Sequence, residues 1–172
     1  MSRASTTRLA VIAAAGLILG AAGAVVAIGP LGAASTPPSS VIPITPCRLI
    51  DTRPPPDNVG QRRAALAEQE TLTVAVVGSN GKCIIPDDAT GIVANVTIAN
   101  PTSAGFLTIF PGAGPLPLTA TTNWEAGQAP SGNLAMIALS DAGSMNIFNS
   151  QGSVDVIVDV VAYMQAATGG GA

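Results

Sequence analysis

The chain has 172 residues, of which 10% are charged and 3% aromatic, and it contains no histidine. Without histidine it cannot build a Ser-His-Asp or Cys-His nucleophile, and it lacks the commonest metal ligand. The net charge of −3 disfavours nucleic acid as a partner. We therefore expect one non-catalytic domain with no cofactor and no metal.

The first 34 residues are predicted to be an export segment. Arg3 and Arg8 precede twenty uncharged residues, 9–28, and GAAS at 32–35 supplies small residues before a cleavage site at Ser35. This layout is typical of a secretory signal peptide. The apolar run is also long enough, about 30 Å as a helix, to remain as a membrane anchor. Both interpretations place the following chain outside the cell or on the outer face of its membrane, and the membrane is a partner only if residues 9–28 are retained.

Three further segments follow the export segment. Residues 35–46 are rich in serine and proline, which predicts an exposed linker. Residues 47–165 are predicted to form the folded domain, and residues 166–172 a flexible tail.

The domain is predicted to be all-β. Ile92, Ala94, Val96 and Ile98 alternate on one face of a strand, and the valines at 154–160 do the same near the end of the chain. Asn80-Gly81 is a tight-turn signal, and residues 57–70 are expected to be a loop with a helical turn at 63–68. Eight strands are expected in an antiparallel two-sheet sandwich of the jelly-roll or Greek-key kind, at 48–52, 72–77, 91–100, 106–110, 121–125, 134–139, 145–149 and 154–163.

The only two cysteines are Cys47 and Cys83. Outside the cell an even pair most simply forms a disulfide. Their spacing does not fit a redox CxxC motif, and two lone sulfurs without histidine make a poor zinc site.

Four motifs resemble a repeat found in secreted bacterial proteins. They are ITPCRLIDTR, CIIPDD before GIVANVTIANP, FLTIFP and SVDVIVDVVAYM, and the resemblance covers residues 41–163. In that family the pattern continues through NVTVxNPTxxGxLTVxP to VIVDVxGYF, and the repeat occurs alone or attached to extracellular hydrolases. The chain departs from the pattern at 121–124 and 162–164. The resemblance implies an accessory, non-catalytic domain of the bacterial cell surface or medium.

Asp51 and Arg53 are the first candidate site, since a carboxylate beside a guanidinium could bind or catalyse. We interpret them as structural, because on a strand they point to the same face and arginine can satisfy several acceptors. Asp155 and Asp159 lie about 13 Å apart along a strand, which is too far for one metal ion or one glycosidic bond. We expect them to pair separately with turn amides or with arginines such as Arg48 and Arg53.

Two further candidates concern ligands. Asp87 and Asp88 follow a proline and suggest turn chemistry, with a calcium ion as the alternative. Trp124, the only tryptophan, is expected in the core; exposed, it would form a sugar-binding face with Asn123.

We expect a secreted or cell-surface interaction module whose partner is an envelope glycan or a surface protein. A carbohydrate-binding or adhesion domain is the alternative. A hydrolase with a carboxylate-only site is the third hypothesis, and the absence of a close carboxylate pair argues against it.

Overall fold

The computed structural model describes residues 39–60 and 62–167. Within these ranges it contains ten β-strands and no helix, so none that could span a membrane. The predicted export segment, the first residues of the predicted linker and residues 168–172 of the tail lie outside the described ranges.

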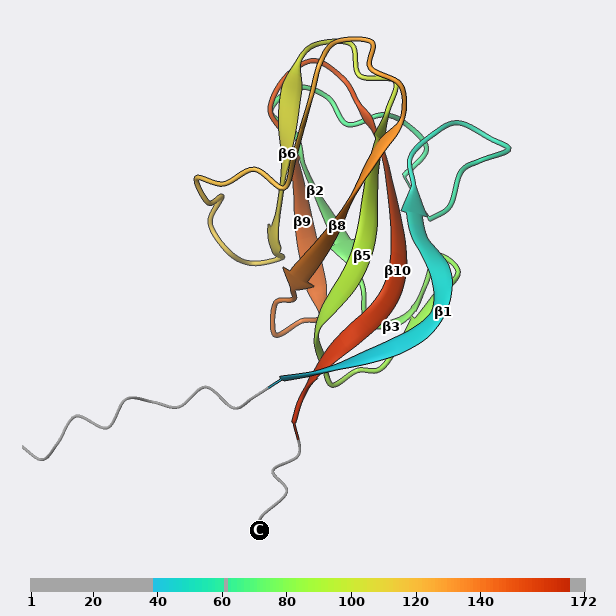
Figure 1. Ribbon diagram of the computed structural model, residues 1–172, viewed down its shortest axis with the longest axis vertical. Coiled ribbons are helices and arrows are strands. Elements are labelled where there is room, and N and C mark those ends of the chain that lie inside the picture. The colour runs from blue at the N-terminus through green and yellow to red at the C-terminus, as the bar shows by residue number, and fades with distance from the viewer. Residues whose placement is uncertain (1–38, 61, 168–172) are drawn as a thin grey trace, which may run out of the picture. The chain divides into compact units, whose positions relative to one another are not determined.

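Two four-stranded antiparallel sheets face each other in a β-sandwich (Figure 1). The predicted all-β, antiparallel, two-sheet fold is therefore confirmed. In spatial order, the first sheet contains β1 (Ser39–Asp51), β10 (Asp155–Ala166), β5 (Ala89–Ala99) and β8 (Ser131–Ala138). The second contains β2 (Thr71–Ala75), β9 (Ser144–Asn149), β6 (Gly105–Pro111) and β7 (Thr122–Trp124), and a separate hairpin pairs β3 (Gly78–Asn80) with β4 (Cys83–Ile85).

The core lies between the sheets and contains the residues that alternate in the sequence. On β5 the predicted apolar face, from Ile92 to Ile98, is completely buried. The valines of β10 at 156, 158 and 160 are buried beside it. Leu107, Met145 and Ile147 are buried from the second sheet. Burial of this apolar surface is the main force that holds the two sheets together.

Residues 39–46, which we predicted to lie in a linker, belong to β1. Ser39 pairs with Ala166 and Ile42 with Tyr163 on β10. Prolines 43 and 46 suggested a break, but β1 is an edge strand, where a missing N–H is tolerated. The register shifts between Pro43 and Cys47, so the prolines make the strand irregular without ending it.

The segment before β2 is also different from the prediction. The expected helical turn at 63–68 is absent from the described residues there. Leu66 instead forms an isolated β-bridge with Val154, and its N–H donates to the Val154 carbonyl at 2.9 Å. Leu66 is fully buried, so this bridge closes one end of the core.

The predicted turn at Asn80-Gly81 joins β3 to β4 and packs against β1. Gly81 has φ +57°, and a Cβ built on it would lie 2.1 Å from the Leu49 carbonyl oxygen. The neighbouring Lys82 N–H donates to the Arg48 carbonyl at 2.8 Å. Glycine is therefore required here both by the backbone conformation and by the close approach of β1.

We expect Gly81→Ala to lower the free energy of unfolding by about 3 kcal/mol, because the backbone strain and the clash with the Leu49 carbonyl add. Gly78→Ala is the matched control: Gly78 also has positive φ, +80°, but a Cβ added to it would meet no atom within 4 Å. This control should cost only about 1 kcal/mol. Urea denaturation followed by Trp124 fluorescence measures both, and equal losses would contradict the close contact with β1.

Candidate functional site

Cys47 and Cys83 form a disulfide, as predicted. Their Cα atoms are 5.3 Å apart, a normal distance for this bond. The bond joins β1 to β4 and thus holds the β3–β4 hairpin against the edge of the first sheet. No other cysteine is present in the chain, so the sulfur chemistry is structural.

Asp51 lies at the centre of an ion-pair network at the end of β1. Its carboxylate is fully buried and accepts hydrogen bonds from Arg48 Nη1 at 2.9 Å and from Arg53 Nε and Nη2 at 3.0 and 2.8 Å. The Arg53 backbone N–H donates to it as well, at 3.1 Å. Arg48 also donates to both oxygens of Asp159, at 2.8 and 3.0 Å. The structure thus brings the predicted residues Asp51, Arg53 and Asp159 together through Arg48.

The pKa values in this network favour fixed charges. Burial raises the pKa of Asp51, but the hydrogen bonds from Arg53 and the charges of Arg53 and Arg48 outweigh it, so the pKa lies below its ordinary value. The hydrogen bond to Asp159 outweighs burial at Arg48 and raises that pKa. The hydrogen bond to Asp51 does the same at Arg53. Because Asp51 stays ionised and its acceptor positions are occupied, it has no proton to donate and little capacity to accept one.

Asp155 belongs to different surroundings from Asp159. It accepts from Thr52 Oγ1 at 3.1 Å and from Asn100 Nδ2 at 2.9 Å, and it is almost fully buried. Among the described residues no group of three His, Cys, Asp or Glu side chains is placed to hold a metal ion. The two aspartates of β10 therefore act as separate structural acceptors.

Asp87 and Asp88 lie in the turn between β4 and β5. The turn is closed by the Ala89 N–H, which donates to the Pro86 carbonyl at 3.1 Å. Asp88 accepts a hydrogen bond from the amide of Gln165. These contacts are those of a turn. The two carboxylates supply fewer oxygen ligands than the six to eight that a calcium ion takes.

Trp124 does not form the sugar-binding face that we considered with Asn123. Its side chain is 5% exposed within the core, and its indole N–H donates to the Ser103 carbonyl at 2.9 Å. Asn123 is exposed on β7 and pairs with Phe106 on β6, on the opposite face of the strand from Trp124. A buried indole cannot stack on a sugar, so the expectation that Trp124 lies in the core is confirmed, and the alternative sugar-binding face with Asn123 is not formed.

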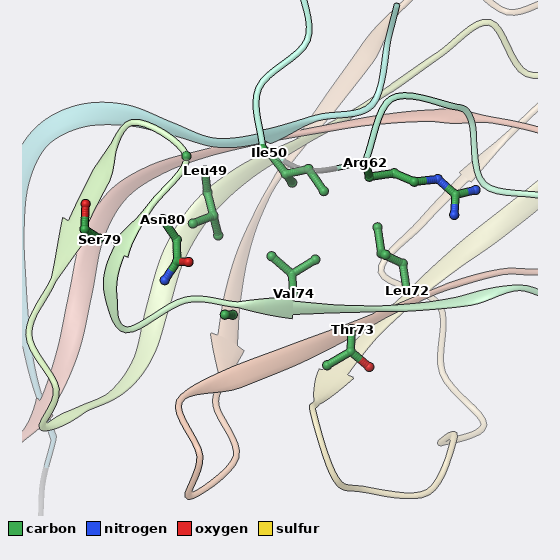
Figure 2. Close-up of a pocket in the computed structure, with 11 residues that line it drawn as sticks. Leu49, Ile50, Arg62, Leu72, Thr73, Val74, Ser79 and Asn80 are labelled. Atoms are coloured by element: carbon green, nitrogen blue, oxygen red, sulfur yellow. The ribbon is translucent and has the colours of Figure 1, made fainter.

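A groove that the sequence did not predict lies between β1 and β2. It has a volume of about 430 Å³. Figure 2 shows Leu49 and Ile50 on one wall pointing toward Leu72 and Val74 on the other. Gly60, Arg62, Thr73, Ala75 and the β3–β4 hairpin residues Ser79, Asn80 and Gly81 complete its lining. We name this the β1–β2 groove.

One wall of the β1–β2 groove is an unpaired strand edge. Two hydrogen bonds flank β2: the Asn149 N–H donates to the Glu70 carbonyl, and the Val76 N–H donates to the Gly143 carbonyl. Together with the register, they show that Leu72 and Val74 exchange hydrogen bonds with β9. In an antiparallel pair the alternate residues point their N–H and C=O groups the other way. The main-chain groups of Thr71, Thr73 and Ala75 therefore point outward and make no hydrogen bond within the described residues.

A second hollow, of about 340 Å³, lies on the outer side of the second sheet. Phe106 and Phe148 form its base, with ring centroids 6.3 Å apart, and the loop 116–120 forms its rim. Leu118 in this loop is fully exposed, and none of the lining residues is charged. The hollow can take an apolar group but offers no chemistry for a reaction.

The geometry therefore presents one neutral groove with an unpaired strand edge, one apolar hollow and a closed ion-pair network. Of these, only the β1–β2 groove combines a mixed apolar and polar lining with main-chain groups that lack partners among the described residues. No protein-family model matches the chain, nor does any curated protein or solved structure.

Proposed function

We propose that this protein is a secreted or cell-surface interaction module without catalytic activity, which binds an extended peptide segment of another surface protein in the β1–β2 groove. The domain is a disulfide-bonded sandwich of the jelly-roll kind behind a signal or anchor segment. The observation that carries the proposal is the free edge of β2 beside the β1–β2 groove, whose lining is mixed apolar and polar.

The described residues that line the groove include no carboxylate, cysteine or lysine that could move a proton. Among them Arg62 alone is charged. The Arg62 guanidinium is held by Glu70 at 2.6 and 2.9 Å and by the carbonyls of Ala64 and Ala65 at 2.8 and 2.7 Å. Burial raises the pKa of Glu70, but the hydrogen bonds from Arg62 and Ala67 outweigh burial and lower the pKa below its ordinary value, so the pair stays charged and internally satisfied. This arrangement supports binding over catalysis.

An extended peptide fits this site better than a glycan does. A strand laid beside β2 would satisfy the outward N–H and C=O groups of Thr71, Thr73 and Ala75, which is how strand addition gains affinity. Alternate side chains of the peptide would enter the groove between Ile50 and Val74. Because the lining offers no free charge and no aromatic face, we expect an uncharged peptide with small or branched apolar residues at alternate positions.

The test is selection of a displayed random decapeptide library on the protein, followed by affinity measurements on Thr73→Pro. The Thr73 N–H points away from β9, so proline keeps the pairing within the sheet but removes one donor from the free edge. We expect the selected peptides to bind Thr73→Pro about tenfold more weakly. The variant loses one hydrogen bond to the peptide, and the proline ring hinders its approach.

Thr73→Ala is the matched control, because both variants lose the bond from Thr73 Oγ1 to Asn146 Oδ1 but alanine keeps the N–H. Peptides should bind Thr73→Ala as they bind the parent protein. Emission of the buried Trp124 checks that both variants are folded. Equal binding to Thr73→Pro, or failure of the library to yield any binder, would contradict the proposal.

A further inference from the structure

β8, at the other edge of the first sheet, is an exposed strand without the usual protection. Its sequence, SGNLAMIA, has no charge and no proline. Leu134 and Met136 are 69% and 67% exposed. Natural edge strands are commonly protected by charged residues, proline, bulges or short length, because an open edge pairs readily with another strand.

The backbone of β8 offers a complete row of free hydrogen-bonding groups. The Leu139 N–H donates to the Thr90 carbonyl at 3.0 Å, and the register with β5 then assigns the residues that face β5. They are the odd-numbered residues from Ser131 to Ile137. The N–H and C=O groups of Gly132, Leu134, Met136 and Ala138 point to the open side and make no hydrogen bond within the described residues.

The other sheet edges in the described ranges differ from β8. The end of β1 is covered, since Asp51 exchanges hydrogen bonds with Val59 at 3.0 and 3.1 Å and Lys82 bonds to Arg48. β7 has three residues and β2 has five, whereas β8 has eight. Among these edges, β8 is longer than β2 and β7, and unlike β1 it carries neither a proline nor a charged residue.

We propose that β8 pairs with β8 of a second copy of this chain, antiparallel across a two-fold axis at Ala135, and joins two first sheets into one continuous sheet. Among the residues whose main-chain groups point outward, the side-chain sizes match about Ala135: Leu134 faces Met136 of the second copy, and Gly132 faces its Ala138. Each of these pairs uses outward-pointing main-chain groups and exchanges two hydrogen bonds. A foreign strand would not need this symmetry.

The pairing also brings together the apolar side chains that β8 exposes. Leu134 and Met136 lie on the same face of the strand, so both copies together form a cluster of four apolar side chains on the outer face of the sheet. Two strands that pair edge to edge bury only a narrow strip of surface. The buried area lies at the lower end of specific interface sizes, below about 1,200 Å². The dimer should therefore be transient, and its test is covalent capture. This site is separate from the β1–β2 groove and does not depend on the proposed function.

The test introduces one cysteine into the full chain, which is expressed in the cells that naturally produce the protein. In the proposed register Ala135 faces Ala135 of the second copy as a non-hydrogen-bonded pair, about 4.5 Å between Cα atoms, within the range for a disulfide. Ala135→Cys should give a disulfide-linked dimer on a non-reducing gel. Ala138→Cys is the matched control, because its two copies would lie about 20 Å apart. We expect at least about tenfold more dimer from Ala135→Cys.

Two further variants test the register and the identity of the partner strand. In the Ala135→Cys background, L134K/M136K places like charges opposite each other and should lower the dimer yield about tenfold. L134K/M136E places opposite charges there and should restore the yield to within about twofold. Both sets of changes lie at exposed positions, so folding is preserved. Equal cross-linking of the two cysteine variants, no cross-linking, or equal yields from the two charge variants would overturn the proposal.

Discussion

Loss of the Cys47–Cys83 bond is expected to lower the free energy of unfolding by about 4 kcal/mol, as the chain-entropy model gives for this loop. The two residues are 36 positions apart in the chain. The bond holds β4 against β1, where the Lys82 N–H also donates a hydrogen bond to the Arg48 carbonyl at 2.8 Å. Since a domain of this size is stabilised by about 5–15 kcal/mol, the loss is a large share of the total.

The measurement is urea denaturation followed by the emission of buried Trp124, with and without a reductant. The variant Cys47→Ala/Cys83→Ala should unfold at the urea concentration of the reduced parent and should not respond to the reductant. Cys83 is almost fully buried, so the variant also loses some packing and can fall slightly below the reduced parent. An unchanged midpoint of the parent on reduction would contradict the stabilising role.

The core strands were predictable because their pattern is local. In β5 and β10 every second residue is apolar and buried, and a period of two defines both the strand and its inner face. The order of strands was not predictable in this way. β10 pairs with both β1 and β5, and the bond between Arg48 and Asp159 joins residues 111 positions apart. Such pairing depends on complementarity between distant segments, which no local window contains.

In the candidate site, too, one part of the arrangement was predictable from the sequence and another part was not. The charges of Asp51, Arg53 and Asp159 drew attention from the sequence, and the structure places them in one network. The β1–β2 groove was missed because it has no charge signature. Its wall depends on the register shift between Arg48 and Ile50 and on the edge position of β2. The one sequence feature that pointed to the groove was the alternation LTVA in a strand without charged residues. This pattern does not show whether the strand lies at the edge of a sheet.

We expect Asp51→Asn to lower the free energy of unfolding by about 3 kcal/mol at neutral pH. The change removes the buried anion that Arg48 and Arg53 contact at 2.9 and 2.8 Å, and it leaves Asp57, at 3.5 Å, as the one remaining ion-pair partner of Arg53 among the described residues. Breaking a buried ion pair typically costs about 3–5 kcal/mol. We take the lower end because both guanidinium groups are partly exposed. Asp57→Asn is the control and should leave the midpoint unchanged, since the Asp57 side chain is 55% exposed.

The same substitution should also change how stability depends on pH. The pKa of Asp51 is lowered in the folded protein from an ordinary value of 3.8, so its contribution is complete above that value and is lost as the pH falls through the lower, folded pKa. The difference in stability between the parent protein and Asp51→Asn should therefore be constant from neutral pH down to about pH 5 and shrink below pH 4. The lowered pKa of Glu70 makes both proteins acid-sensitive and cancels in the comparison. Unfolding curves at pH 7, 5 and 3 measure this difference. A difference that stays constant down to pH 3 would show that Asp51 stabilises the end of β1 through its shape and neutral hydrogen bonds, and the ionic network would then have no part in the stability of the fold.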